Sequence, residues 1–185
     1  NEKTTASQIL APHQGRTRQR MADAPTVLVL QDTSLLDYSH HPAKQGLGPL
    51  GTPKQKSCGL LMHTALAVTP TGMPLGIVSQ AFWARSAEVK AATPAARRKL
   101  PIAAKESIKW LNALDDTVHW APPGARVVTV GDSEADVFEL FDHARTKQTD
   151  LLIRAGQPRA LCAPEVGNIW DVLAAQPVAG HLQVH

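Results

Sequence analysis

The chain has 185 residues, of which 43% are hydrophobic and 19% are charged. This length and composition fit one globular domain and exclude a disordered chain. Lysine and arginine outnumber aspartate and glutamate by 19 to 16, so the net charge of +3 permits a nucleic-acid partner without requiring one. Two cysteines exclude a disulfide scaffold, and no apolar run approaches the roughly 20 residues of a membrane span. We therefore expect a cytoplasmic protein without membrane contact.

The first half of the sequence predicts an arm followed by three strands. Residues 1–24 are mostly polar and indicate an N-terminal arm or linker, in which residues 7–21 can form a short helix. Residues 26–31 are a β-branched and leucine run, typical of a strand buried on both faces. Residues 57–83 hold two more apolar runs joined by Thr69-Pro70-Thr71-Gly72, which favours a turn. This order predicts an antiparallel hairpin after the first strand.

The second half of the sequence alternates between predicted helices and strands. Their order is helix 102–114, strand 126–131, a helix capped by Ser133 with its apolar face over 137–144, strand 150–154 and helix 169–175. A hairpin followed by alternating strands and helices predicts a mixed α/β sheet with helices on its faces.

Two aspartates stand at the ends of predicted strands, Asp32 after residues 26–31 and Asp132 after residues 126–131. In open α/β sheets, sites form outside the carboxyl ends of strands. Two converging carboxylates repel each other unless a cation separates them, and their oxygens favour Mg²⁺ or Mn²⁺. Such a site can activate water or a 3′-hydroxyl for phosphoryl transfer. From spacing alone, local capping roles for both aspartates are the better interpretation.

Several short motifs follow one another in a specific order. They are Gln31-Asp32-Thr33-Ser34, the loop ending Leu47-Gly48-Pro49-Leu50-Gly51, Lys105-Glu106-Ser107-Ile108-Lys109-Trp110-Leu111, Asp132-Ser133-Glu134-Ala135-Asp136 and Ile153-Arg154-Ala155-Gly156-Gln157-Pro158-Arg159. Together they resemble the catalytic core of DDE transposases, in the insertion-sequence branch that carries an Asp-x-Glu-Ala-Asp motif. The resemblance extends over nearly the whole chain, from about Ile9 to the end.

The resemblance implies a ribonuclease-H-like fold and an enzyme that cleaves and joins DNA strands in cut-and-paste transposition. It implies two metal ions, Mg²⁺ with Mn²⁺ as a substitute, and a homodimer on double-stranded DNA. It assigns the first two catalytic and metal-binding carboxylates to Asp32 and Asp132, which agrees with their strand-end positions.

The family's third carboxylate, a Glu on a late helix near Tyr, Arg and Lys, has no counterpart in this chain. Tyr38 is the only tyrosine, and the last acids, Glu165 and Asp171, lack those neighbours. The chain also begins without Met. We therefore expect a fragment that is inactive or nearly so. Its expected parts are the arm (1–24), a partial core truncated before the last catalytic helix (25–177) and the start of a β-rich insertion (178–185).

Basic residues near the expected site are candidates for DNA contact. Arg154 and Arg159 lie in the segment that resembles the DNA-facing edge of the family, and Lys54 and Lys56 follow Asp32 in a loop. Phosphate contacts supply much of nucleic-acid affinity. For each lysine, ordinary surface charge is the better interpretation, and Arg154, at a strand end, is the strongest candidate.

His63 alternates with Leu60 and Met62, so in a regular strand it faces away from both. We expect a histidine that flanks the core rather than a metal ligand. The same structural role is favoured for Trp110, which we expect to pack in or over the core.

Two other functions stay open. A decayed transposase that binds DNA without chemistry accounts for the missing Glu and the positive charge. A phosphoaspartate or small-phosphate enzyme also uses a strand-end aspartate, and it predicts no affinity for DNA.

Overall fold

The computed structural model describes residues 4–41, 43–51, 57–86, 96, 99–161, 167–181 and 183. They form two compact units, Asn1–Arg154 and Ala155–His185. The second unit holds α6 (Ile169–Ala175), at the bounds that the sequence predicts. Among the described residues, no helix has both the length and the apolar character that crossing a bilayer requires.

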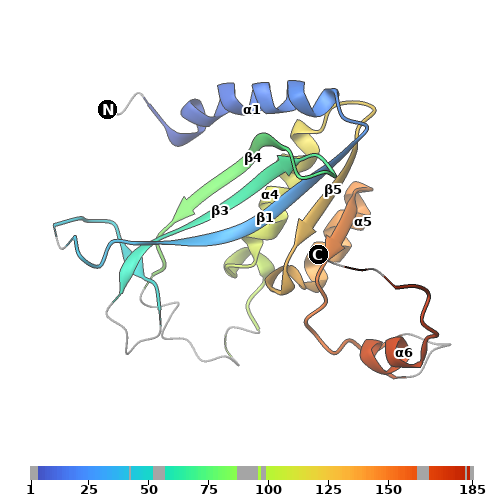
Figure 1. The fold of residues 1–185 in the computed structure, drawn as a ribbon. Coiled ribbons are helices and arrows are strands. Elements are labelled where there is room, and N and C mark those ends of the chain that lie inside the picture. The colour runs from blue at the N-terminus through green and yellow to red at the C-terminus, as the bar shows by residue number, and fades with distance from the viewer. Residues whose placement is uncertain are drawn as a thin grey trace. The chain divides into compact units, whose positions relative to one another are not determined.

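The first unit holds a sheet and its helices (Figure 1). In chain order its elements are α1 (Ala6–Ala22), β1 (Thr26–Asp37), β2 (Gly48–Pro49), β3 (Cys58–Val68), β4 (Pro74–Trp83), the 3₁₀ turn η1 (Ile102–Ala104), α4 (Ile108–Trp120), β5 (Arg126–Gly131), the 3₁₀ turn η2 (Ser133–Ala135), α5 (Phe138–Lys147) and β6 (Asp150–Ile153).

The sheet is mixed. Its strand order is β4-β3-β1-β5-β6, and the short β2 pairs with the start of β3. β3 runs antiparallel to β1 and β4, whereas β5 is parallel to β1 and β6 is parallel to β5. This order, with these directions, is that of a ribonuclease-H-like fold, so the predicted fold class is confirmed.

The two faces of the sheet differ in how they are covered. In β1, Val27 and Val29 point to one face and are fully buried. Leu30 points to the other face and is 37% exposed. The covered face packs against α1 and α4 in a cluster of Met21, Val27, Val29, Ala65, Ala67, Leu75, Val78, Ala113 and Val127. A second cluster joins α4 to α5 and consists of Trp110, Leu111, Leu114, Ala135, Leu140 and Ala144. The helices therefore pack against β1 and β5 from one side.

α1 lies along β4, the outer strand of the sheet (Figure 1). The Gln14 side-chain amide donates to the Val78 carbonyl at 2.6 Å, and the Ile77 N–H donates to His13 Nε2 at 3.0 Å. These bonds occupy backbone groups that an edge strand otherwise offers to other chains. The polar N-terminal segment is thus packed against the sheet, and a capping box at Thr5 begins its helix.

The predicted helix over residues 102–114 has the wrong bounds. Residues Ile102–Ala104 form a 3₁₀ turn, and α4 begins at Ile108 and continues to Trp120. Its buried face extends to Thr117, which is fully buried. The bounds of α4 follow from the packing of residues 108–120 on the sheet. The spacing of Ile108, Leu111 and Leu114 indicates a helix but does not determine where it begins.

The hairpin prediction is confirmed, but β1 is longer than expected. The turn between β3 and β4 closes through the Gly72 N–H, which donates to the Thr69 carbonyl at 2.9 Å, with Gly72 at φ +88°. β1 continues past Gln31 to Asp37 because β3 pairs with it as far as Gly59. Asp32 therefore lies inside β1 rather than after it.

Candidate active site

The register of β1 and β5 brings the two predicted aspartates to one level of the sheet. The parallel pairing runs from Thr26 with Arg126 to Leu30 with Val130. Asp32 and Asp132 each lie two residues beyond that last pair, and both are exposed. β5 ends at this level while β1 continues alone beside β3. Asp32 thus lies on β1 and Asp132 directly after the neighbouring strand β5, at the carboxyl end of the parallel part of the sheet.

Arg154 extends this row onto a third strand. Gly131 pairs with Ile153 of β6, and the Arg154 N–H donates to the Gly131 carbonyl at 3.1 Å. Asp32, Asp132 and Arg154 therefore form a row at one level of the sheet, in that order. The Arg154 side chain is exposed. A guanidinium at this point can bind a phosphate that approaches the two carboxylates.

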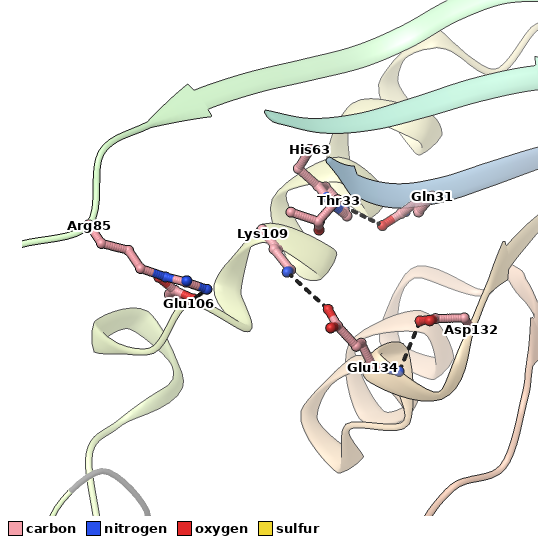
Figure 2. Close-up of polar contacts among 8 residues, drawn as sticks. All are labelled: Gln31, Thr33, His63, Arg85, Glu106, Lys109, Asp132 and Glu134. Atoms are coloured by element: carbon pink, nitrogen blue, oxygen red, sulfur yellow. Dashed lines mark hydrogen bonds and ion pairs between the residues drawn. The ribbon is translucent and has the colours of Figure 1, made fainter. Parts of the chain in front are cut away.

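The turn after β5 is fixed by close packing. A Cβ atom at Gly131 would lie 2.6 Å from Ala135 Cβ, which is too close for any side chain unless the turn moves, and 3.5 Å from Trp110 Cζ3, which is ordinary contact. Asp132 Oδ1 accepts the Glu134 N–H at 2.9 Å and so caps η2 (Figure 2). Ser133, predicted as the cap of the next helix, does not cap it, because α5 begins only at Phe138 and Val137 is its N-cap.

Two ion pairs lie at the start of α4, and one of them, between Lys109 and Glu134, reaches the turn after β5 (Figure 2). Lys109 Nζ lies 3.5 Å from Glu134 Oε2, and the Lys109 side chain is only 11% exposed. Arg85, just after β4, forms a bidentate pair with Glu106, with Nε–Oε1 at 2.5 Å and Nη2–Oε2 at 2.8 Å. Partial burial raises the pKa of Glu106, but the Arg85 pair outweighs it and the net shift is downward.

His63 lies in the core beneath the carboxylate row, as expected for a structural histidine. It is 2% exposed, and its ring packs edge-on against Trp110 at a centroid distance of 4.6 Å. Nδ1 lies 2.8 Å from Thr33 Oγ1 and Nε2 lies 3.2 Å from Gln31 Oε1 (Figure 2). Burial, aided by the Lys109 charge and opposed by Asp32, lowers the His63 pKa to about 4. The ring is therefore neutral at pH 7.

The other predicted DNA contacts are placed differently. Arg159 is half-buried in the second unit, where its carbonyl accepts the Ile169 N–H at 2.9 Å. Lys54 and Lys56 lie outside the described residues, as do residues 182, 184 and 185 of the expected insertion.

The residues that could hold a divalent cation are Asp32 and Asp132. Both offer exposed carboxylate oxygens, and the Glu134 N–H accounts for a single hydrogen bond at one oxygen of Asp132. Within the described ranges, no group of three or more His, Cys, Asp or Glu side chains is arranged to hold a metal ion. The donor set fits a hard cation that keeps several waters.

Sequence reasoning missed the charged side chains around the turn. Lys109, Glu106 and Glu134 stand within motifs that the resemblance uses, but the ion pairs that they form were not predicted. The sequence offers no signal of them, because the predicted helix begins at residue 102, whereas Lys109 lies in the first turn of α4, where a cation is unfavourable. Its partner, 25 residues away, is visible only once the strands are paired.

No family model matches the chain. Among solved structures, the chain is similar to one described as the crystal structure of the Mos1 strand transfer complex. The TM-score is 0.36 at 10% sequence identity, and the match covers 78% of this chain and 42% of that chain. The chain thus spans less than half of the length of that protein. The strand order of the sheet, rather than this similarity, is the basis of the fold assignment.

Proposed function

We propose that this chain is the first part of the catalytic core of a DDE-type DNA transposase of the insertion-sequence kind. It would cleave and join DNA strands by metal-assisted phosphoryl transfer, as in cut-and-paste transposition. The observation that supports this most directly is the β1–β5 register, which sets Asp32 and Asp132 at one level of the sheet. The Asp-x-Glu-Ala-Asp motif at 132–136 supports it from the sequence.

Asp32 and Asp132 would hold Mg²⁺, or Mn²⁺ in its place. Bound there, the ion would supply charge neutralisation, an activated water or 3′-hydroxyl and stabilisation of the leaving oxygen. The fold would keep the two carboxylates at fixed positions. Asp32 is held by the pairing of β1 with β3, and Asp132 is held by the packed turn after Gly131. Two carboxylates at one level of the sheet repel each other unless a cation lies between them, which favours cation binding.

Double-stranded DNA is the proposed partner, and Arg154 is the proposed phosphate contact nearest to the carboxylates. Its exposed guanidinium forms no ion pair among the residues that the structure describes. Arg159, Lys54 and Lys56 remain proposed contacts on the sequence resemblance. The intact protein is proposed to act as a homodimer, and its third carboxylate is expected outside this stretch.

Metal binding tests the proposal. Titration of Mn²⁺ into the chain, followed by the loss of the free-ion electron paramagnetic resonance signal, is expected to show a site in the wild type. Asp32→Asn and Asp132→Asn are each expected to abolish it. Asp150→Asn is the matched control, because Asp150 begins β6 and pairs with Arg126 away from the row. Unchanged Mn²⁺ binding in either site variant would overturn the proposal.

A DNA-binding module without chemistry is the second candidate, favoured because the described residues bring together two carboxylates rather than three. In the intact protein, Asp32→Ala separates the candidates. Loss of transposon-end cleavage with DNA affinity retained supports the enzyme. Wild-type protein that binds transposon ends but never cleaves them supports the module.

A further inference from the structure

Lys109 occupies a position that is unfavourable for a lysine. It is in the first turn of α4, where the free backbone N–H groups carry partial positive charge. Its side chain is 89% buried, and an ammonium group removed from water requires a compensating partner. The residue therefore has to be explained by what its Nζ contacts.

Glu134 is that partner, because the carboxylate nearer in the sequence, that of Glu106, is already paired with Arg85. Glu106, three residues before Lys109, already uses both carboxylate oxygens in its bidentate pair with Arg85. Glu134 Oε2 lies 3.5 Å from Lys109 Nζ, and the Glu134 side chain is 67% exposed. Lys109 Nζ also lies 5.3 Å from the centre of the Trp110 ring, which adds a cation–π contact to the ion pair.

Glu134 connects this ammonium to the candidate site. Its backbone N–H donates to Asp132 Oδ1 at 2.9 Å, while its side chain reaches Lys109 (Figure 2). One residue thus fixes the rotation of the Asp132 carboxylate with its main chain and anchors the turn to α4 with its side chain. The Gly131 contact with Ala135 holds the base of the same turn.

We propose that Lys109 is a positioning residue, which acts through Glu134 to hold the Asp132 carboxylate in the orientation that binds the cation. The inference rests on the proposed function, because it requires Asp132 to be a metal ligand. Lys109 itself touches neither the metal nor the reacting atoms in this proposal.

The test compares Lys109→Met, Glu134→Gln and the double variant with Lys105→Met as a matched control. Lys105 is a neighbouring lysine whose Nζ lies 3.8 Å from Glu139, away from the turn. Hydrogen exchange of the Glu134 amide is expected to accelerate in both single variants and to remain unchanged in Lys105→Met. The Mn²⁺ affinity is expected to fall roughly tenfold in both single variants, with no further loss in the double variant.

Glu134→Gln keeps the test decisive if Lys109→Met folds poorly, because Glu134 is largely exposed. The new side-chain amide can still accept a hydrogen bond from Lys109 but no longer neutralises its charge, so the melting temperature is expected to fall together with the Mn²⁺ affinity measured on the folded protein. A merely structural role would lower the melting temperature and leave the Mn²⁺ affinity of the folded protein unchanged. Unchanged amide exchange and unchanged Mn²⁺ affinity in Glu134→Gln would overturn the inference. Additive losses in the double variant would also overturn it. If Asp132→Asn leaves Mn²⁺ binding intact, or the wild type binds none, the proposed function fails instead, and amide exchange still judges the Lys109–Glu134 link.

Discussion

At the scale of single residues, the turn that carries Asp132 depends on the glycine before it. Gly131 lies against Ala135, Ile153 and Trp110, so its missing side chain is what lets the turn fold back onto α4. His63 and Gln31 form a polar layer directly beneath, in which the Gln31 Nε2 atom has no partner among the described residues. Both features are consequences of burial, and each can be measured.

Gly131→Ala is expected to destabilise the fold by about 1–3 kcal/mol, because the new methyl group meets Ala135 at an impossible distance. Urea denaturation measures the loss. Gly15→Ala is the control: its Cβ has open space within α1, and alanine is the better helix former. A Gly131→Ala protein as stable as the wild type would show that the turn can move away.

The low pKa of His63 predicts an acid-dependent loss of stability. Burial keeps the folded ring neutral down to about pH 4, whereas the unfolded ring takes up a proton near its ordinary value of 6.5. Between these values the unfolded state binds more protons, so stability falls as the pH falls. The loss from pH 7 to pH 4 is expected to be about 3 kcal/mol.

Urea unfolding at pH 7 and pH 4 measures that loss, and His63→Gln is expected to remove most of it. His119→Gln, which replaces an exposed histidine on α4, is the matched control. Equal pH dependence in wild type and His63→Gln would show that other groups cause it.

At the scale of elements, the Arg85–Glu106 pair ties the end of β4 to the start of α4. Arg85 Nη1 also donates to the Leu50 carbonyl at 3.2 Å, so one side chain joins three segments. Arg85→Ala leaves Glu106 half-buried without its counter-charge and is expected to cost about 1–3 kcal/mol. Arg126→Ala breaks a pair that is largely exposed and should cost under about 1 kcal/mol. Thermal melting measures both losses. Equal losses would show that the Arg85–Glu106 pair contributes no more to stability than the exposed Arg126–Asp150 pair.

The same scale shows what the sequence can and cannot predict. The strands β3, β4, β5 and β6 were predictable because each is rich in apolar and β-branched residues. β1 past Gln31 was not, since Thr33 and Ser34 break the apolar run and only pairing with β3 keeps the chain extended. The level shared by Asp32, Asp132 and Arg154 depends on register, which no local pattern encodes.

At the scale of the whole molecule, the proposed function predicts salt-sensitive DNA binding in which Arg154 contacts a phosphate. Arg154→Ala is expected to weaken binding to double-stranded DNA and to lower the slope of log affinity against log salt by about 1. Fluorescence anisotropy between roughly 50 and 200 mM salt measures this. Arg145→Ala, which removes a 78% exposed charge from α5, is the control. An unchanged slope in Arg154→Ala would exclude it from the phosphate contacts.

The helix along β4 has a consequence for how the chain can be shortened. Without α1, the Ile77 N–H and the Val78 carbonyl lose the side chains of His13 and Gln14 and face water. Such a bare strand recruits a strand from another molecule, by pairing or by exchange. A protein that starts at residue 25 is therefore expected to self-associate in size-exclusion chromatography at concentrations where the full chain stays monodisperse. The polar N-terminal helix therefore prevents other molecules from pairing with the edge of the sheet.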